Sequence, residues 1–324
     1  MILVVTLNPA LDITHHVAGA DWAGVNRPFA VHAKAGGKGL NVARTLRALG
    51  QPVTLTGLAG GLTGQALRDG LAGTGIVAEL TPIAGETRRT FAIADSVRGQ
   101  TALFNEPGPA VSEREYQRFF VGYERALASS AAVVLSGSLP GGIPADAYAG
   151  LVAAAARAGV PSILDSDGPA LAHGVAAGPA LVKPNLAELQ AVAGRAAGAA
   201  GPPAGPDLPA VEAAARGLVA AGAGAVVVSL GARGLLAVAP DGAWHARPPG
   251  PVAGNPTGAG DAVVAGLADS LARGRDWPAM LRHAVALGTA AAGAPVAGEF
   301  ALADYERLVT TVEVIGAAAG RGCG

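Results

Sequence analysis

The residues with the clearest chemical meaning are Gly254-Asn-Pro-Thr-Gly-Ala-Gly-Asp261, which precede an apolar run of helical appearance. Glycines just before a helix leave backbone N–H groups without partners, and these donors and the helix dipole can hold an anion. A carboxylate at such a seat is useful if it takes a proton from a hydroxyl that attacks phosphorus. Gly258, Ala259, Gly260 and Asp261 therefore favour phosphoryl transfer to an alcohol. The alternative is a turn followed by an ordinary first-turn carboxylate.

A second glycine-rich helix start lies at Ala35-Gly-Gly-Lys-Gly-Leu-Asn-Val-Ala-Arg44. Lys38 stands among three glycines, one of them Gly37, so its ammonium can reach an anion. Asn41 falls in the first predicted helical turn, where it can bond a hydroxyl or cap the helix. This is not a Walker A loop, because Gly39 rather than Ser or Thr follows the lysine. A glycine-rich helix entry with a solvated lysine is the alternative.

Two further candidates lie at strand boundaries. Asp12 follows an apolar run at residues 2–7 that is typical of a buried strand, and ligands of open α/β sheets bind at the carboxyl edge. Asp12 can therefore hold sugar hydroxyls, or it forms an Asx turn. Arg88 and Arg89 are adjacent in a strand-like segment and so point to opposite faces. We favour Arg88 as a phosphate ligand in a cleft; the alternative is two exposed edge charges.

A third group is Lys183-Pro-Asn-Leu-Ala-Glu188, which follows another predicted strand. Asn185 and Glu188 share a helix face, and their oxygens suit Mg²⁺ beside a nucleotide whose phosphates Lys183 can touch. The competing explanation is a capping box made by the same two residues. The turn at Ser229-Leu-Gly-Ala-Arg-Gly234 would let a nucleotide lie against the backbone, or it is simply a tight turn.

The elements that must position these residues alternate in type. Strand-like runs at 131–136, 162–165, 180–183 and 225–229 alternate with helical lengths, which indicates βαβ units and a parallel sheet. A strand is also predicted at 53–58, followed by a loop from Gly57 to Gly64 and a helix from Gln65. No internal repeat is visible.

Composition limits the possible partners. The chain has 324 residues and a net charge of −1, which gives no support for nucleic-acid binding. Its one cysteine, Cys323, allows neither an internal disulfide nor a cysteine-based metal site. No uncharged apolar run reaches membrane length without Gly or Pro, and the N-terminus has no basic region of a signal peptide. We therefore expect a cytoplasmic protein with no membrane or nucleic-acid partner.

Six motifs in a fixed order carry a resemblance to a known family. They are Leu7-Asn-Pro-Ala-Leu-Asp12, Ala35–Asn41, Ser136-Gly-Ser-Leu-Pro140, Val182–Glu188, Ser229-Leu-Gly and Thr257–Asp261. The set resembles the ribokinase-like (phosphofructokinase B) sugar kinases, and within them the hexose-phosphate branch of 1-phosphofructokinases and tagatose-6-phosphate kinases. The resemblance spans roughly residues 2–310.

The resemblance implies an α/β fold: one three-layer αβα domain over residues 1–324, with a mostly parallel sheet and a small β lid from segments of about 12–33 and 86–104. A homodimer through the lid is expected, with ATP and Mg²⁺ as cofactors. It implies Asp261 as catalytic base and the backbone of Gly258, Ala259 and Gly260 as anion hole. The implied sugar-phosphate contacts are Asp12, Gly37, Lys38, Asn41, Arg88 and Ser138. The implied nucleotide and metal contacts are Lys183, Asn185, Glu188, Ser229, Gly231 and Gly234.

The expected reaction is ATP-dependent phosphorylation of a ketohexose phosphate. Fructose 1-phosphate is the first choice of acceptor, and tagatose 6-phosphate and fructose 6-phosphate are alternatives. A non-catalytic sugar-phosphate sensor is an alternative of another class; a nicotinamide oxidoreductase lacks the expected GxGxxG motif. The chain departs from the family pattern at Asp167 and at Asn255-Pro256, where relatives tend to carry a small or hydroxyl residue and a Ser or Thr with an apolar residue, respectively.

Overall fold

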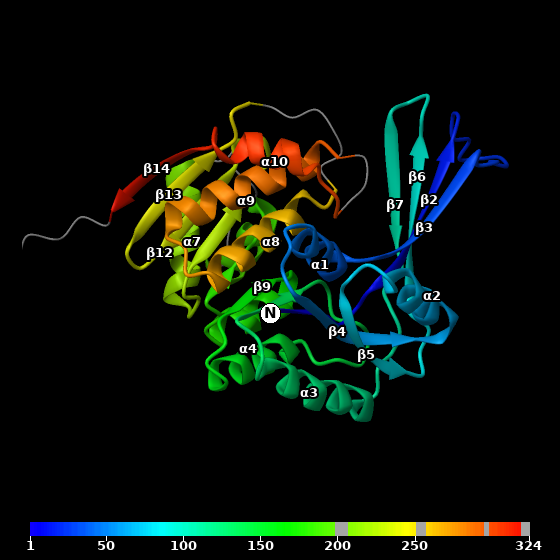
Figure 1. Cartoon of the computed structure of the whole chain (residues 1–324), viewed down its shortest axis with the longest axis horizontal. Helices are drawn as coiled ribbons and strands as arrows, with labels where there is room; N and C mark the ends of the chain where they lie inside the picture. Colours follow the sequence, from blue (N-terminus) through cyan, green and yellow to red (C-terminus); the bar gives the residue numbers. More distant parts are fainter. Residues whose placement is uncertain (198–206, 251–256, 295–297, 319–324) are drawn as a thin grey trace, which may run out of the picture.

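The structure is a computed structural model that describes residues 1–197, 207–250, 257–294 and 298–318. Asn255-Pro256 and Cys323 lie outside these ranges, so the expectations attached to them are not taken further. The described chain forms a large layered body with a small sheet projecting from one side (Figure 1).

The large sheet positions most of the predicted site residues. Within the described chain its strand order is β14-β13-β12-β11-β10-β9-β8-β1-β4-β5. The strands β11, β10, β9, β8, β1, β4 and β5, in this spatial order, are parallel to their neighbours. Strands β12, β13 and β14 extend the sheet in antiparallel pairing. Its strands are β1 (Ile2–Thr6), β4 (Val53–Gly60), β5 (Val77–Ile83), β8 (Ala132–Ser136), β9 (Ser162–Asp165), β10 (Leu181–Val182), β11 (Val226–Ser229), β12 (Leu235–Ala239), β13 (Gly242–Arg247) and β14 (Glu313–Ala318).

Helices cover both faces of this sheet, as the resemblance implies. Successive residues of β1 belong to opposite cores, with Leu3 and Val5 on one face and Ile2 and Val4 on the other. The first core is closed by α3 (Glu113–Leu127), α4 (Ala147–Arg157), α5 (Gly168–Ala176), α6 (Leu186–Ala197) and α7 (Leu208–Ala220). The second is closed by α1 (Lys38–Ala48), α2 (Gly61–Leu71), α8 (Ala259–Ala272), α9 (Trp277–Ala292) and α10 (Leu302–Val309).

The small sheet has the strand order β3-β2-β6-β7. Its strands are β2 (Ala10–Val17), β3 (Ala30–Gly36), β6 (Arg88–Asp95) and β7 (Gln100–Asn105). Two separate chain segments, residues 10–36 and 88–105, contain these strands. The pairing register places Asp12, Lys34, Arg88 and Thr90 on one face.

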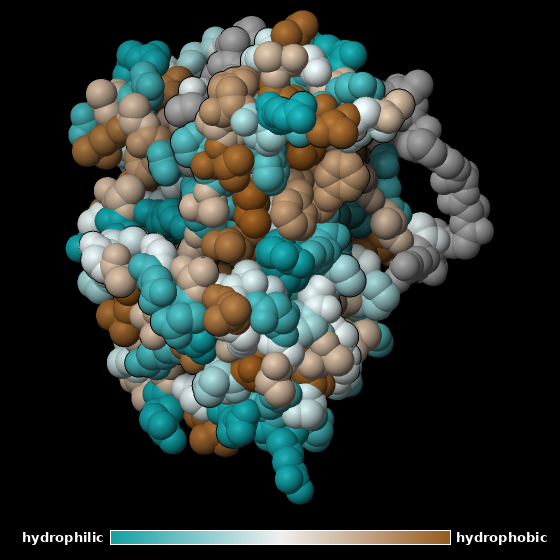
Figure 2. All heavy atoms as spheres, turned by 90° about the vertical axis from the view of Figure 1, so that its right-hand side faces the viewer, coloured by the Kyte–Doolittle hydropathy of each residue, from teal (hydrophilic) through white to brown (hydrophobic). Residues whose placement is uncertain are grey.

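The opposite face of the small sheet is mostly apolar, although His15 and Arg89 also lie on it. The same register places on it Ile13, Val31, Phe91, Ile93 and Phe104. Val31 and Phe104 are exposed by 54% and 52%, although Trp22 packs against the Phe104 ring with centroids 6.3 Å apart. Figure 2 views the molecule from the side on which the small sheet projects, where hydrophobic and hydrophilic residues are interspersed.

One local prediction is wrong. The segment Gly57–Gly64 is not a loop, because β4 continues to Gly60 and α2 begins at Gly61. Gly57 is required by packing rather than by a turn: a Cβ there would lie 1.9 Å from the carbonyl oxygen of Thr6 on the neighbouring strand β1. In the described chain, no helix is both long and apolar enough to cross a membrane.

Candidate functional site

Two glycine-capped helix starts meet at the centre of the site. Gly37 precedes α1 with φ 99°, Gly258 precedes α8 with φ 85°, and neither helix has a side-chain cap. No side-chain cap therefore occupies the first N–H groups of α8, which can donate to another acceptor. The side-chain amide of Asn41 in α1 donates a 2.9 Å hydrogen bond to Asp261 Oδ2 in α8, which joins the two starts directly.

Asp261 is a buried carboxyl group with a strongly raised pKa. It is 7% exposed in the first turn of α8. Burial raises its pKa to about 7, with repulsion from the Asp165 carboxylate as the next cause, while Asn41, Lys38 and Lys183 oppose the rise. A carboxylate with such a pKa can accept a proton near neutral pH and later release it.

Asp165 is a site residue that the sequence reasoning missed. It is the last residue of β9 and is 1% exposed. Lys183 Nζ lies 3.2 Å and Lys38 Nζ 3.6 Å from its Oδ1, and Ser136 donates to Oδ2 over 3.3 Å. Burial alone would raise the pKa of Asp165, but Lys183 and Lys38 hold it below its ordinary value. Its position at a strand's carboxyl end, the argument already used for Asp12, could have identified it.

The two lysines lie beside the start of α8. A Cβ at Gly260 would be 3.8 Å from Lys183 Nζ, and Lys183 is 4% exposed. Burial alone would lower the pKa of Lys38, but the carboxylates of Asp165 and Glu188, followed by Asp261 and Asp167, raise it above its ordinary value. The Lys38 ammonium therefore stays charged beside the first turn of α8, where Lys183 Nζ also lies.

Asn185 and Glu188 form the capping box that the sequence left as an alternative. Asn185 N donates to Glu188 Oε2 over 2.8 Å, and Glu188 N donates to Asn185 Oδ1 over 2.9 Å. Glu188 Oε1 lies 3.9 Å from Lys38 Nζ and points toward the same group of charges. This one oxygen fits an Mg²⁺ that keeps most of its waters and bridges phosphates. Among the described residues, no three or more His, Cys, Asp or Glu side chains gather into a metal cage.

Asp12 and Arg88 line the adjoining face of the small sheet. Asp12 accepts hydrogen bonds from the Thr90 side chain and the Gly37 N–H, and burial raises its pKa above the ordinary value despite them. A Cβ at Gly36 would lie 1.8 Å from Asp12 Oδ2, so the carboxylate lies directly over this glycine. Arg88 is half-buried, and burial lowers its pKa although the Asp12 carboxylate opposes this.

Asn8 connects Arg88 with Ser138, and the sequence reasoning did not select it. Its carbonyl oxygen accepts from Arg88 Nε over 3.0 Å, and its side-chain amide donates to Ser138 Oγ over 3.1 Å. The amide also donates to Pro107 O over 3.0 Å. A buried asparagine just beyond Leu7, in the turn that follows β1, therefore brings together the predicted phosphate contacts of two distant segments.

The two glycines after β11, Gly231 and Gly234, have different surroundings. Gly234 has φ 84°, and a Cβ there would lie 2.0 Å from Ala246 O, so strand packing alone requires a glycine. Gly231 has φ 61° and open space beside it. Ser229 forms a bridge with Asn185, so this turn lies next to the start of α6. Asp167 is exposed and is the N-cap residue of α5.

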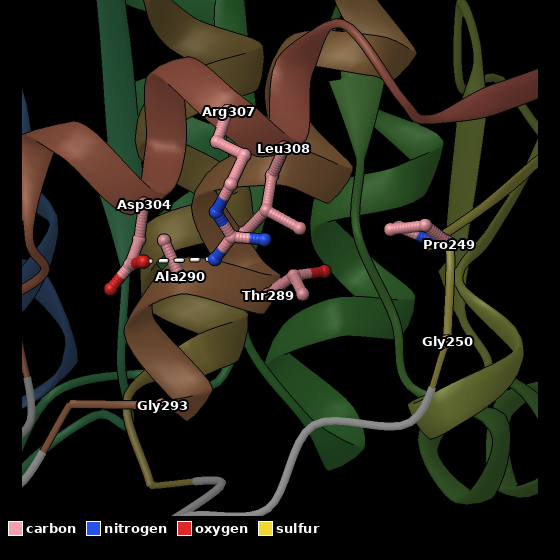
Figure 3. A pocket seen from close by; sticks show the side chains of 8 residues that line it. All are labelled: Pro249, Gly250, Thr289, Ala290, Gly293, Asp304, Arg307 and Leu308. Carbon is pink, nitrogen blue, oxygen red and sulfur yellow. Dashed lines mark hydrogen bonds and ion pairs between the residues drawn. The ribbon is translucent and has the colours of Figure 1, made fainter.

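A cavity of about 370 Å³ lies on the α9 side of this region. Figure 3 shows Arg307 and Leu308 of α10 facing Thr289 and Ala290 of α9, with Pro249 across the opening. Its remaining lining residues are Gly250, Gly293 and Asp304. The cavity is near the anion seat, because α9 touches the first turn of α8: a Cβ at Gly288 would be 3.3 Å from Ala259 O.

Comparisons with known proteins identify the fold and the family. A 1-phosphofructokinase of Rhodobacter capsulatus is 39% identical over 293 residues, which are 90% of this chain and 90% of that protein. The phosphofructokinase-2 of Escherichia coli, solved with potassium, superposes with a TM-score of 0.86 at 30% identity, covering 95% of this chain and 98% of that one. The Arabidopsis thaliana ribokinase shares the fold, with a TM-score of 0.74 at 19% identity, covering 95% and 98% of the two chains.

The fold is therefore ribokinase-like, with a large mostly parallel sheet between helices and a separate small sheet. The sequence matches the family described as pfkB family carbohydrate kinase over residues 5–302. Because this match covers most of the chain, and the carboxylate, lysines and helix starts described above lie within it, the chain belongs to the pfkB family of carbohydrate kinases and is an ATP-dependent sugar kinase.

Proposed function

We propose that this protein transfers the γ-phosphoryl group of ATP to fructose 1-phosphate, giving fructose 1,6-bisphosphate and ADP. The observation that carries the proposal is the position of Asp261, a buried carboxylate with a pKa of about 7 in the first turn of α8. The choice of acceptor is supported by the relative from Rhodobacter capsulatus, which is named 1-phosphofructokinase. Tagatose 6-phosphate and fructose 6-phosphate are the alternatives.

In the proposed reaction, Asp261 accepts the proton of the sugar's free primary hydroxyl. The hydroxyl oxygen forms a bond to the γ-phosphorus, the bond between that phosphorus and the β–γ bridging oxygen breaks, and ADP leaves. The backbone N–H groups of Gly258, Ala259 and Gly260 are the donors for the charge that develops on the phosphoryl oxygens. Lys38 and Lys183, both held by Asp165, add positive charge at the same place.

The face of the small sheet with Asp12 and Arg88 is the proposed place of the sugar phosphate. Asp12 accepts hydroxyl donors from the sugar, and Arg88 and Ser138, which Asn8 connects, bind its existing phosphate. Positioning the acceptor in this way converts the reaction into an effectively unimolecular step. The small sheet also acts as a lid that keeps water away from ATP.

The cavity beside α9 is the proposed place of the nucleotide base. Its wall is apolar at Ala290 and Leu308, which suits an aromatic ring, and Arg307 can stack on that ring. The turn from Ser229 to Gly234 and the start of α6 lie on the proposed path of the nucleotide. Mg²⁺, held through Glu188 Oε1 and water, would neutralise phosphate charge.

We also propose that two copies of the chain associate through the lid. The support is the apolar outer face of the small sheet, which is opposite to the face with Asp12 and Arg88. Burying this face against a second copy removes apolar surface from water without covering the acceptor site. The cytoplasmic location stays a prediction.

The direct test is a coupled ADP-release assay with Mg-ATP. Fructose 1-phosphate, tagatose 6-phosphate, fructose 6-phosphate, fructose and ribose are compared at equal concentrations. We expect the highest kcat/KM with fructose 1-phosphate. A clear preference for another phosphorylated ketohexose would keep the site and change the isomer. A preference for an unphosphorylated sugar would reject the roles of Arg88 and Ser138.

A further inference from the structure

Arg44 has no role in the proposed reaction. It lies between the small sheet and Asn41, the residue that contacts Asp261. Its NH2 group donates to the carbonyl oxygen of Ala35, near the end of β3, and its NH1 group donates to Asn41 Oδ1 over 3.4 Å. Asn41 in turn donates from Nδ2 to Asp261 Oδ2 over 2.9 Å. A continuous chain of contacts therefore runs from the small sheet to Asp261.

Resting on the proposed role of Asp261 as base, we propose that Arg44 is a positioning residue, which fixes the side-chain amide of Asn41 so that its NH₂ group faces Asp261. An asparagine amide can present either its oxygen or its nitrogen to a neighbour, whereas an arginine can only donate. Arg44 therefore selects Oδ1 of Asn41 and leaves Nδ2 for the carboxylate.

The surroundings leave Asn41 little freedom to turn away. Asn41 is 6% exposed. Gly298 lies against it, because a Cβ at Gly298 would be 2.8 Å from Asn41 Oδ1 and 3.0 Å from its Cα. The amide can therefore exchange its two ends but cannot leave Asp261. Without Arg44, the oxygen end can face a carboxyl group that is protonated.

The charged groups around Arg44 and Asp261 determine how loss of Arg44 would change the ionisation of Asp261. Burial lowers the pKa of Arg44, and the carboxylates of Asp12 and Glu299 oppose this shift. The charge of Asp165 raises the pKa of Asp261. The hydrogen bond from Asn41 and the charges of Lys38 and Lys183 lower it. The donor from Asn41 favours the ionised form of Asp261, which is the form that accepts a proton. Loss of Arg44 therefore weakens the base below neutral pH and leaves it ionised at high pH.

The test is the pH profile of kcat/KM for Arg44→Met, which keeps an unbranched apolar stem and removes every side-chain donor. We expect a loss of about tenfold at pH 6.5, the effect of one hydrogen bond, and recovery close to the unmodified activity at pH 9. KM for ATP stays unchanged. The matched control is Arg47→Met, on the exposed side of the same helix, which we expect to leave the profile unchanged.

A double-mutant cycle with Asn41→Ala separates positioning from other roles. If Arg44 acts through Asn41, Arg44→Met has no further effect on the acid side of the profile in the Asn41→Ala background. Additive effects, or a loss that is the same at pH 6.5 and pH 9, would overturn the proposal. An Arg44→Met effect confined to the KM of the phosphorylated sugar would also overturn it, because it would make Arg44 a substrate ligand.

Two further variants keep the outcome interpretable. Arg44→Lys keeps the positive charge and a single donating group, the ammonium, so its profile is expected between those of the unmodified protein and Arg44→Met. It replaces Arg44→Met if the latter does not fold. Asp261→Asn tests the base assignment separately. If Asp261→Asn abolishes turnover while Arg44→Met and Arg44→Lys leave the profile unchanged, only the positioning role fails. If Asp261→Asn keeps its activity, the proposed base fails first.

Discussion

Lys183 Nζ lies 3.2 Å from Asp165 Oδ1, and both side chains are almost completely buried. Asp165 ends β9 and Lys183 follows β10, two neighbouring parallel strands, so the pair forms at the carboxyl edge of the sheet. Lys38 shares the same oxygen at 3.6 Å. One carboxylate therefore fixes two ammonium groups beside the start of α8, and it also repels Asp261.

Replacing the proposed base tests the chemistry most directly. Asp261→Asn keeps the size of the side chain and removes the proton acceptor, so kcat should fall roughly 100- to 10,000-fold. The dissociation constant for ATP, measured by calorimetry, should change little, because the backbone donors of α8 remain. A variant with nearly normal kcat would show that another group accepts the proton.

The pH dependence should report the same carboxyl group. Asp261 accepts a proton only when ionised and its pKa is about 7, so kcat/KM should fall as pH decreases through about 7. Asp165→Asn removes the neighbouring negative charge and should therefore move this fall to lower pH. It should also raise KM for ATP, because Lys38 and Lys183 lose their ion-pair partner. Asp167→Asn, two residues along and exposed, is the matched control. Equal profiles for both variants would reject the coupling.

Arg88 and Arg89 provide a pair of matched variants for acceptor binding. Arg88→Gln should raise KM for fructose 1-phosphate roughly tenfold to a hundredfold through loss of a charge-assisted hydrogen bond. Arg89→Gln should have little effect, because Arg89 is paired with Glu106 and lies over the Phe91 ring. Steady-state kinetics with varied sugar phosphate measures both. Equal effects, or an effect of Arg89→Gln alone, would exclude Arg88 as the phosphate ligand.

Filling the cavity beside α9 should affect the nucleotide alone. Thr289→Leu adds apolar volume where the base is proposed to lie and should raise KM for ATP several-fold, with KM for the sugar phosphate unchanged. Thr310→Leu makes the same change at an exposed position outside the cavity. If Thr289→Leu leaves KM for ATP unaltered, the base lies elsewhere.

The association through the lid can be tested by adding charge. Phe104→Asp places a carboxylate on the apolar outer face of the small sheet, so the mass in solution should fall from that of a dimer to that of one chain. Thr101→Asp puts the same charge on the opposite face of β7 as a control. Sedimentation velocity measures both. A dimer that persists in Phe104→Asp, or an unmodified protein of single-chain mass, contradicts this interface.

The sequence determined what depends on local order. Glycine before an apolar helical run creates a helix start with unsatisfied donors wherever the run folds, so Gly37 and Gly258 could be recognised without tertiary contacts. Alternation of strand-like and helical lengths fixed the parallel sheet, because parallel strands need crossover connections. The adjacency of Arg88 and Arg89 fixed their opposite directions in a strand.

Only the tertiary structure decided which groups meet and what their burial does to them. Asp165 and Asn8 acquire partners from strands and segments far away in the chain, and Asn41 reaches Asp261 only because α1 packs against α8. The strand character of Gly57 follows from the close approach of β1, which the sequence alone does not reveal. A pKa near 7 at Asp261 likewise comes from desolvation and from the Asp165 charge, and both require the folded sheet edge.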